Sequence, residues 1–261
     1  MVAGKLSTSP LYARDITVSI GSRCLVRDLS LPFPRGEVIA LLGRNGSGKT
    51  LTLHTLAGLR SAQGGEVLVN GTPLQSLARK NVAQTIGVLT QDTEEGFATT
   101  ALEAVLIGRH PHLKLLQWES TEDRSIADES LKRVGLTEFA QRLTDTMSGG
   151  ERRRVAIASL LAQQPSVFLL DEPTNHLDPH HQLAILGLFK ELARNGSTVI
   201  ASLHDPTLAA RFADRALLLF GDGRWRAGTS EEMLTADTLS ELYLTPMHET
   251  MINGHRVFVF A

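Results

Sequence analysis

Hydrophobic positions along this chain form short runs in its two outer parts and a helical period in the middle. Residues 16–20 alternate between apolar and polar side chains, which predicts a half-buried strand, and residues 25–31 extend this pattern until prolines at 32 and 34 end it. The apolar runs at 37–42 and 166–170 are typical of buried strands in a parallel sheet. Further strands are predicted at 66–69, 86–90, 198–202 and 216–220.

Helices are predicted where apolar residues recur every three or four positions. They cover 49–59, 100–107, 122–134, 148–164 and 179–195, and a last one runs from Ser230 to about Tyr243 behind a capping box of Thr229 and Glu232. This order predicts an α/β fold with a parallel-sheet core and an N-terminal antiparallel β part. We expect one domain, with a core at about 1–91 and 164–227, a helical insertion at about 92–163 and a helical tail at about 228–261.

Residues 43–50, Gly-Arg-Asn-Gly-Ser-Gly-Lys-Thr, match the phosphate-binding pattern G-x-x-x-x-G-K-[ST] between a predicted strand and a predicted helix. Gly43 and Gly48 allow the backbone to turn tightly and to approach phosphate oxygens. The amides that follow point inward at a helix N-terminus, which favours negative charge. Lys49 supplies a point charge for the β- and γ-phosphates, and the Thr50 hydroxyl is placed to ligate Mg²⁺. The segment therefore predicts a nucleoside triphosphate site.

An acidic pair, Asp171 and Glu172, follows the apolar run 166–170 at the edge where α/β sheets hold their ligands. Asp171 is placed to hold Mg²⁺, directly or through water. Glu172 is placed to act as general base toward the water beyond the γ-phosphate. The alternative is a strand end that runs into a polar loop, but the phosphate loop upstream favours the catalytic interpretation.

A second anion-binding cap is predicted at Ser148, Gly149 and Gly150, where two glycines and a serine begin a helix. One nucleotide cannot use two such caps of one chain if they lie in different parts of the fold. An antiparallel homodimer resolves this, because each cap then completes the site of the partner. The Ser148 hydroxyl and the two glycine amides would contact the γ-phosphate across the interface.

The segments GRNGSGKT, MSGGE (147–151), VFLLDE (167–172) and NHLD (175–178), together with Gln91 and His204, resemble the nucleotide-binding subunit of ABC (ATP-binding cassette) transporters. The resemblance implies a P-loop NTPase fold with a RecA-like sheet, and hydrolysis of ATP with Mg²⁺. It makes Gln91 the sensor glutamine and His204 the switch histidine at the γ-phosphate, and it places Asp178 in a loop at the dimer interface. The implied nucleotide-binding residues are Gly43, Asn45, Gly46, Ser47, Gly48, Lys49, Thr50, Ser148, Gly149, Gly150 and Asp178. The implied catalytic residues are Glu172, His204, Lys49 and Gln91, and the implied Mg²⁺ ligands are Thr50, Gln91 and Asp171.

A finer resemblance, at 106–111, 177–182, 203–211 and 228–235, is to the ATPases of type II importers for iron–siderophore chelates, haem or cobalamin. It implies a homodimer bound peripherally to a permease dimer at the cytoplasmic side of the inner membrane, with a substrate-binding protein as an indirect partner. Residues Thr93 to Glu103 are the expected groove for the permease. Two alternatives stay open: the ATPase subunit of an exporter, and a soluble ABC ATPase that acts on DNA or ribosomes.

Composition and charge agree with this interpretation. The chain has 261 residues, of which 42% are hydrophobic, which is enough for a full core. Its formal net charge of −2 argues against nucleic acid or a lipid surface as partner. We expect no secretory signal at residues 1–10 and no membrane-spanning run. The single cysteine, Cys24, suits a reducing compartment, and we expect it to be a buried small hydrophobe.

Some positions depart from the family pattern or invite another interpretation. Ile20 stands where the family often stacks an aromatic residue on adenine, so we expect looser base selectivity. Met147 and Glu151 replace the commoner Leu and Gln. We expect Arg152–Arg154 to form a solvated face with interface or phosphate contacts rather than a nucleic-acid site. The histidines at 110, 112, 176, 180 and 181 lack Cys or carboxylate partners at ligand spacing, so we expect no zinc site.

Overall fold

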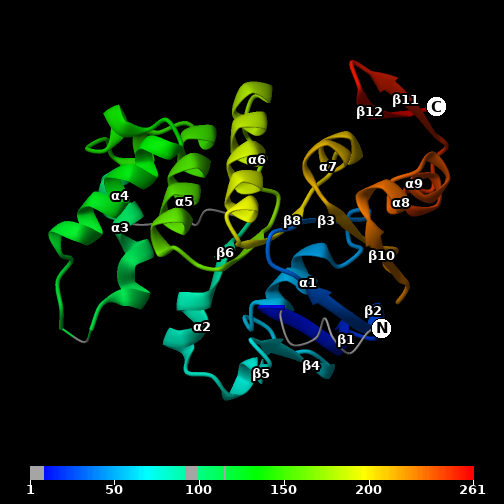
Figure 1. Ribbon diagram of the computed structural model, residues 1–261, viewed down its shortest axis with the longest axis horizontal. Coiled ribbons are helices and arrows are strands. Elements are labelled where there is room, and N and C mark those ends of the chain that lie inside the picture. Colours follow the sequence, from blue (N-terminus) through cyan, green and yellow to red (C-terminus); the bar gives the residue numbers. More distant parts are fainter. Residues whose placement is uncertain (1–8, 92–98, 115) are drawn as a thin grey trace.

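A six-stranded sheet runs through the middle of the computed structural model, which describes residues 9–91, 99–114 and 116–261 (Figure 1). In order across the sheet, the strands are β10 (Trp225–Thr229), β9 (Arg215–Leu219), β3 (Val38–Leu42), β8 (Thr198–Ser202), β7 (Val167–Leu170) and β6 (Ile86–Leu89). Neighbouring strands pair in parallel, except that β10 is antiparallel to β9. The predicted α/β fold with a parallel-sheet core is confirmed.

The central strands are mostly apolar because both faces of the sheet are covered. Every residue of β3, β7 and β8 is buried. Side chains 39 and 41 of β3 pack toward α1 (Lys49–Leu56) and a second sheet, whereas side chains 38, 40 and 42 pack toward the helices on the opposite face. Because successive side chains of a strand point to opposite faces of the sheet, β3 contributes to two separate hydrophobic cores.

The second sheet is antiparallel, as predicted, and carries the N-terminal residues. Its order is β2 (Arg23–Phe33), β1 (Leu11–Ile20), β4 (Gly64–Val69) and β5 (Thr72–Pro73). The prediction that β2 ends before Pro32 is wrong, because the strand continues to Phe33 and Pro32 pairs with Tyr12 of β1. An edge strand has one side without a hydrogen-bond ladder, so it tolerates a residue that lacks an N–H. Cys24 is half-buried in β2 rather than fully buried.

The helical insertion lies between β6 and β7 and forms the green part at the left of Figure 1. It contains α3 (Ala101–Leu106), α4 (Thr121–Arg133) and α5 (Gly149–Gln163), with the short 3₁₀ helices η3 (Ile107–His112), η4 (Thr137–Phe139) and η5 (Thr144–Thr146). A capping box begins each of the three α-helices: Thr100 with Glu103, Ser120 with Asp123, and Ser148 with Glu151. These reciprocal bonds satisfy backbone N–H groups at the helix starts.

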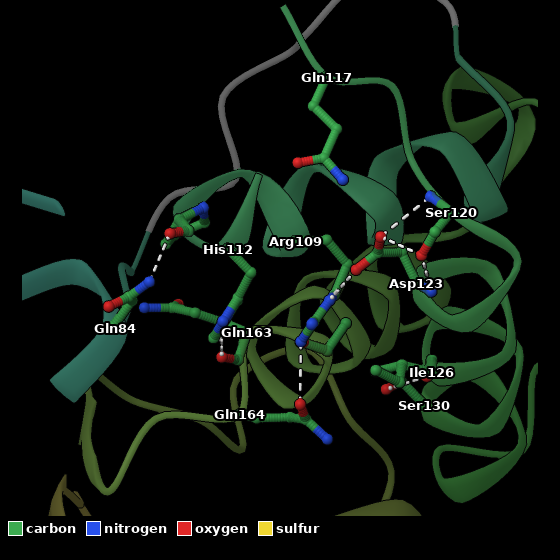
Figure 2. Close-up of polar contacts among 12 residues, drawn as sticks. Gln84, Arg109, His112, Gln117, Ser120, Asp123, Ile126, Ser130, Gln163 and Gln164 are labelled. Carbon is green, nitrogen blue, oxygen red and sulfur yellow. Dashed lines mark hydrogen bonds and ion pairs between the residues drawn. The ribbon is translucent and has the colours of Figure 1, made fainter. Parts of the chain in front are cut away.

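A buried ion pair joins the helices of the insertion (Figure 2). Arg109 of η3 is 7% exposed, and its Nε donates to Oδ1 of Asp123 in α4 at 2.8 Å. Its Nη1 donates to the Ala162 carbonyl at 2.7 Å and to Oε1 of Gln164 at 2.9 Å, at the end of α5. Hydrogen bonds from Ser120 and from Arg109 lower the pKa of Asp123 to about 2. One guanidinium group therefore ties three helical segments together.

The same region is bound to the sheet side of the molecule (Figure 2). Gln84 of α2 (Arg79–Thr85) donates from Nε2 to the Pro111 carbonyl at 2.8 Å. His112 Nε2 lies 2.8 Å from the Gln163 carbonyl, and the Gln163 amide donates to the Ile86 carbonyl at 3.0 Å. The C-terminal end of α5 is thus fixed to the start of β6.

The remaining helices of the described residues lie outside the helical insertion. They are η2 (Leu74–Ser76), α6 (Pro179–Arg194), α7 (Pro206–Phe212), α8 (Ser230–Met233) and α9 (Ala236–Tyr243). In the part of the chain that the structure describes, none of the helices has the length and apolar character needed to span a bilayer.

The C-terminal segment corrects the expected helical tail at about 228–261. The predicted capping box of Thr229 and Glu232 is present, but the chain from 247 to 260 forms an antiparallel hairpin of β11 (Met247–Ile252) and β12 (His255–Phe260). Asn253 and Gly254 connect its strands with φ angles of 50° and 77°, a turn that an Asn-Gly pair adopts readily. This Asn-Gly pair, which follows Met251 and Ile252 and precedes the run at 257–260, was the overlooked signal. Phe258 anchors the hairpin, since it is 7% exposed and its N–H donates to Oγ1 of Thr207 in α7 at 3.1 Å.

Candidate functional site

The predicted phosphate-binding segment joins β3 to α1 at the C-terminal edge of the large sheet. A Cβ on Gly43 would lie 2.4 Å from Oγ of Ser47 and 2.5 Å from the Leu219 carbonyl. Gly48 has a φ of 103°, and a Cβ there would lie 3.1 Å from Cβ of Leu25. Both positions therefore need glycine: Gly43 because a side chain has no room, and Gly48 because of both space and backbone conformation.

Lys49 lies inside this loop, with only 6% of its surface exposed. Its Nζ donates to the Gly43 carbonyl at 2.8 Å and to the Arg44 carbonyl at 3.4 Å. Burial lowers the pKa of the ammonium group, while the nearby carboxylates of Glu172 and Asp171 act in the opposite direction. The loop thus holds a desolvated cation close to two carboxylates, a setting that attracts a phosphate together with a metal cation.

Asp171 and Glu172 follow β7 at the same edge of the sheet, and Ser202 of β8 binds both. Its Oγ donates to Oδ1 of Asp171 at 2.6 Å and accepts from the Glu172 N–H at 2.8 Å. The backbone of Glu172 has a φ of 49°, which residues other than glycine rarely adopt. Ser202 is a residue that the sequence analysis missed. The available signal was a polar side chain at the end of a buried strand, two residues before His204.

The Glu172 carboxylate is 9% exposed and is held at both oxygens. His204 contacts Oε1 through Nε2, and Asn175 donates from Nδ2 to Oε2. His204 comes from the segment after β8 and Asn175 from the segment after β7. The structure therefore brings the expected base and the expected switch histidine into direct contact.

Two buried side-chain oxygens at this edge accept or donate no hydrogen bond within the described residues: Oδ2 of Asp171 and Oγ of Ser47. Buried polar atoms in native proteins nearly always have a partner. The Ser47 hydroxyl can donate to a phosphate oxygen, and Oδ2 of Asp171 can bind a hard cation or its water. With Lys49 beside them, these residues fit a phosphate group accompanied by a divalent cation.

The second predicted cap lies at a different place, a cavity of about 440 Å³. The cavity is lined by 148–151, Arg154, 176–178 and His181, and by no residue of 43–50. A Cβ on Gly150 would lie 2.9 Å from the His176 carbonyl, so the segment 176–178 approaches the start of α5 this closely only because the residue is glycine. The cavity therefore unites Ser148, Gly149 and Gly150 with Asp178.

A capping box closes the start of α5 beside this cavity. Oγ of Ser148 accepts from the Glu151 N–H at 3.2 Å, and Oε2 of Glu151 accepts from the Ser148 N–H at 2.7 Å. This backbone hydrogen bond lowers the pKa of Glu151. A carboxylate thus already lies at the helix N-terminus that is expected to receive a phosphate.

The expectation of one solvated basic face at Arg152–Arg154 is wrong for Arg153, whereas Arg154 lines the cavity beside Ser148. Arg152 is exposed, but its Nη1 donates to the Met147 carbonyl at 2.8 Å, and Arg154 donates to a carbonyl in the loop after α4 at 3.1 Å. Arg153 is 2% exposed and faces the sheet. Three successive helical residues span most of a turn, so they cannot share one face, and α5 is packed on more than one side.

Gln91 is exposed at the end of the described segment that contains β6. Its carbonyl accepts from Nη1 of Arg153 at 3.4 Å. Its role toward Mg²⁺ and the γ-phosphate stays a prediction. Most of the expected permease groove, Thr93 to Glu103, lies outside the described residues, since 92–98 are not among them.

Comparison with known families decides what this site belongs to. A family model described as ABC transporter matches residues 26–175, which is more than half of the chain. The chain belongs to the ABC transporter family. As a member of that family it is an ATP-binding protein and an ATPase, and the predicted fold and family are confirmed.

Curated relatives of this ABC ATPase cover nearly all of its length. It is 39% identical over 258 residues to the hemin import ATP-binding protein HmuV of Deinococcus radiodurans. The alignment covers 97% of this chain and 93% of the relative. It is 35% identical over 234 residues to the iron(3+)-hydroxamate import ATP-binding protein FhuC of Bacillus subtilis. This alignment covers 89% of this chain and 87% of the relative.

Solved structures give the same result for the fold of this ABC ATPase. A metal-chelate type ABC transporter in an inward-facing conformation superposes with a TM-score of 0.84 at 27% identity, over 97% of both chains. A bacterial ABC transporter cassette solved as a dimer has a TM-score of 0.74 at 29% identity, over 84% of this chain and 98% of that chain.

Proposed function

We propose that this ABC ATPase drives a membrane importer that takes up an iron–siderophore chelate, haem or cobalamin. The observation that carries the ATPase part is the placement of Lys49, Asp171, Glu172 and His204 at one edge of the sheet, with buried oxygens left to bind a phosphate and a cation. The import part is supported by relatives whose names describe import of hemin and of iron(3+)-hydroxamate.

ATP binds along the loop between β3 and α1. The amides from Asn45 through Gly46, Ser47 and Gly48 to Thr50 surround the phosphates at the start of α1. Lys49, whose Nζ donates to the Gly43 and Arg44 carbonyls, transfers these hydrogen bonds to β- and γ-phosphate oxygens. The close packing of Gly43 and Gly48 supports this path of the backbone.

The residues that would hold Mg²⁺ are Thr50, Gln91 and Asp171, the last directly or through water. Hydroxyl, amide and carboxylate oxygens are the donors that this cation prefers. When bound, Mg²⁺ supplies positive charge that offsets the charge of the phosphates. The buried Oδ2 of Asp171 supports its place in this set, because Ser202 already holds the other oxygen.

Glu172 acts as the general base in hydrolysis. Its carboxylate accepts a proton from water while the water oxygen attacks the γ-phosphorus, and the bond to the β-phosphate oxygen breaks in line. His204 exchanges its contact with Glu172 for a γ-phosphate oxygen, which frees one carboxylate oxygen for the water. Lys49 offsets the charge that develops on the leaving oxygen.

Two copies bind two ATP molecules between them. Ser148, Gly149 and Gly150 of one copy contact the γ-phosphate on the other, and Asp178 lies at the same interface. The separation of the cavity at 148–151 from residues 43–50 supports this arrangement, as does the dimeric cassette with the same fold. The dimer sits peripherally on a permease dimer at the cytoplasmic face of the membrane, and a substrate-binding protein delivers the cargo to the permease.

The test is to tag the Glu172→Gln variant, solubilise host membranes with ATP and Mg²⁺ present, and identify the proteins that co-purify. A polytopic permease with about ten spans per subunit supports the importer. Its cognate binding protein is then titrated with a ferric siderophore, haem and cobalamin. Recovery of an export protein, ribosomes or DNA contradicts the import proposal and leaves the ATPase assignment in place.

A matched Lys49→Ala variant serves as the control in the same purification. It is expected to lose ATP binding, so any partner that requires the ATP-bound form is recovered from Glu172→Gln membranes and not from Lys49→Ala membranes. Equal recovery with both variants would mean that the partner does not respond to ATP.

A further inference from the structure

Arg153 lies buried in α5, five residues after Ser148, and its guanidinium group faces the sheet. Nη1 donates to the Thr90 carbonyl at 2.5 Å and to the Gln91 carbonyl at 3.4 Å. Nη2 donates to the Asp171 carbonyl at 2.5 Å and to the Glu172 carbonyl at 2.8 Å. The residue is 2% exposed, so these bonds form in a dry environment in which they are strong.

The four carbonyls belong to two adjacent strand ends. Leu89 of β6 is in register with Leu170 of β7, and the chain continues from these residues to Gln91 and to Glu172. A guanidinium group is planar and carries donors on separate nitrogens, so one side chain can bridge both strand ends at once. A lysine ammonium is a point charge without this fork. The arrangement therefore uses a property that is specific to arginine.

The Glu172 backbone is held on both sides by these contacts. Its N–H donates to Ser202 Oγ and its carbonyl accepts from Arg153, while its φ of 49° lies in the left-handed region. A residue other than glycine stays in that region only where its surroundings enforce it. The orientation of the catalytic carboxylate therefore depends on where α5 places Arg153.

We propose that Arg153 is a positioning residue that makes the geometry of Glu172 and Gln91 depend on the position of α5. The first residues of α5 include the cap that would bind the partner's ATP, and Arg153 lies about 7.5 Å farther along the helix axis. Capture of the partner's γ-phosphate by Ser148 fixes α5, and Arg153 transmits that position to Glu172 in the chain's own site. This inference rests on the proposed roles of Ser148, Gln91 and Glu172.

The first experiment compares Arg153→Met with Arg152→Met in the full-length protein. Both variants remove one guanidinium group from the same helix, but the Arg152 side chain is exposed and binds the Met147 carbonyl. Arg153→Met is expected to lower kcat at least tenfold while the Kd for ATP stays within threefold of wild type. Arg152→Met is expected to keep kcat within twofold. A wild-type kcat in a folded Arg153→Met protein would overturn the proposal.

If Arg153→Met does not fold, as judged by thermal unfolding, Arg153→Lys carries the same test. Lysine keeps the charge and most of the length but cannot bridge both strand ends. Its kcat is expected to fall at least threefold with an unchanged Kd for ATP. A wild-type kcat in Arg153→Lys would show that a guanidinium group bridging both strand ends is not required, and would overturn the proposal.

A double-mutant cycle with Ser148→Ala separates positioning from a general loss of stability. Because part of the effect of Ser148 reaches Glu172 through Arg153, the double variant is expected to have a higher kcat than the product of the two single-variant effects predicts. Multiplicative effects of the two substitutions would overturn the inference and leave the proposed function standing. A wild-type kcat in Ser148→Ala alone would instead contradict the role proposed for Ser148 in the partner's site.

Discussion

His204 Nε2 contacts Glu172 Oε1, so a histidine after β8 and a carboxylate after β7 hold each other in place. Asn175 binds the second oxygen of the same carboxylate. A general base must present a lone pair to the water it activates, and a histidine that binds a γ-phosphate must point toward it. Under the proposed mechanism, the His204–Glu172 contact must open before hydrolysis, and a γ-phosphate that attracts His204 would open it.

Removal of either partner of this contact is expected to slow hydrolysis and to spare ATP binding. Glu172→Gln should lower kcat by about 10²–10³-fold, because an amide cannot accept the proton, and should accumulate an ATP-bound dimer. His204→Ala should lower kcat by about 10–100-fold. Steady-state phosphate release gives kcat, and size-exclusion chromatography with ATP gives the dimer fraction. Wild-type turnover in Glu172→Gln would show that another group is the base.

Lys49→Ala is expected to abolish measurable ATP binding. The substitution removes a buried cation from the centre of the phosphate loop, and no other lysine lies in 43–50. Lys132→Ala is a suitable control, since that exposed side chain pairs with Glu129 on α4 at 3.2 Å. Calorimetric titration with ATP should give a wild-type Kd for the control. An unchanged Kd in Lys49→Ala would place the triphosphate elsewhere.

Ser202→Ala is expected to lower kcat by about tenfold or more with a smaller effect on the Kd for ATP. The hydroxyl binds Oδ1 of Asp171 and the Glu172 N–H, and a hydrogen bond to a charged group contributes about 1.5–3 kcal/mol. The Mg²⁺ concentration at half-maximal rate should rise, because Asp171 is less well oriented. Ser76→Ala, at the exposed end of η2, is the matched control. An unaltered Mg²⁺ dependence in Ser202→Ala would argue against Asp171 as a ligand.

Asp123 is expected to make stability depend on pH in the acid range. Its pKa is about 2 in the folded chain and about 3.9 when unfolded, so ionisation favours the folded state. The contribution is complete at neutral pH, begins to decline as the pH approaches about 4, and is lost as the pH falls through about 2. Asp123→Asn should lower the free energy of unfolding at pH 7 by about 3–5 kcal/mol, because it leaves Arg109 buried and unpaired.

Urea unfolding of Asp123→Asn and wild type at pH 7 and at pH 3 checks this prediction. The difference between the two proteins should shrink at the lower pH. Asp128→Asn, at an exposed position of the same helix, should change stability by less than about 0.5 kcal/mol at either pH. A difference that stays constant with pH would mean that Asp123 does not stabilise the fold through its charge.

Ile20→Tyr is expected to tighten ATP binding by about 2–12-fold and to sharpen the preference for ATP over GTP. Ile20 is 58% exposed at the end of β1, and an aromatic ring adds about 0.5–1.5 kcal/mol of stacking on a base beyond its buried area. Ile107→Tyr, at a residue that is 55% exposed in the helical insertion, is the control. Equal ATP affinities for wild type and Ile20→Tyr would show that the base does not lie over this position.

Local patterns were sufficient for the parts of the fold that depend on neighbouring residues. The loop at 43–50 is such a case, because its glycines, its lysine and the flanking strand and helix all lie within a few residues. The capping box of Thr229 and Glu232 is another, since both of its hydrogen bonds join residues three positions apart. The buried strands were recognisable because parallel strands covered on both faces are mostly apolar.

The unpredicted parts depend on contacts between distant segments. Ser202 and Asp171 are 31 positions apart, and Arg153 and Thr90 are 63 apart, so no short pattern in the sequence links them. Pro32 was taken to end a strand because its position at the sheet edge is a property of the assembled sheet. The C-terminal hairpin is different: its Asn-Gly turn was visible in the sequence, but the preceding helix-capping signal was extended too far along the chain.

The packing of the C-terminal hairpin on α7 determines how stable a form of this protein without the hairpin would be in the cell. Phe258 packs on α7, and its N–H donates a hydrogen bond to Thr207 of that helix. Helix α7 begins two residues after His204. A premature stop codon after α9 would leave every residue proposed to bind nucleotide in the product but would uncover apolar surface on α7. Such a product is expected to be removed by cellular proteases, so a nonsense mutation near the end of the gene would be seen as low abundance rather than as a defective ATPase.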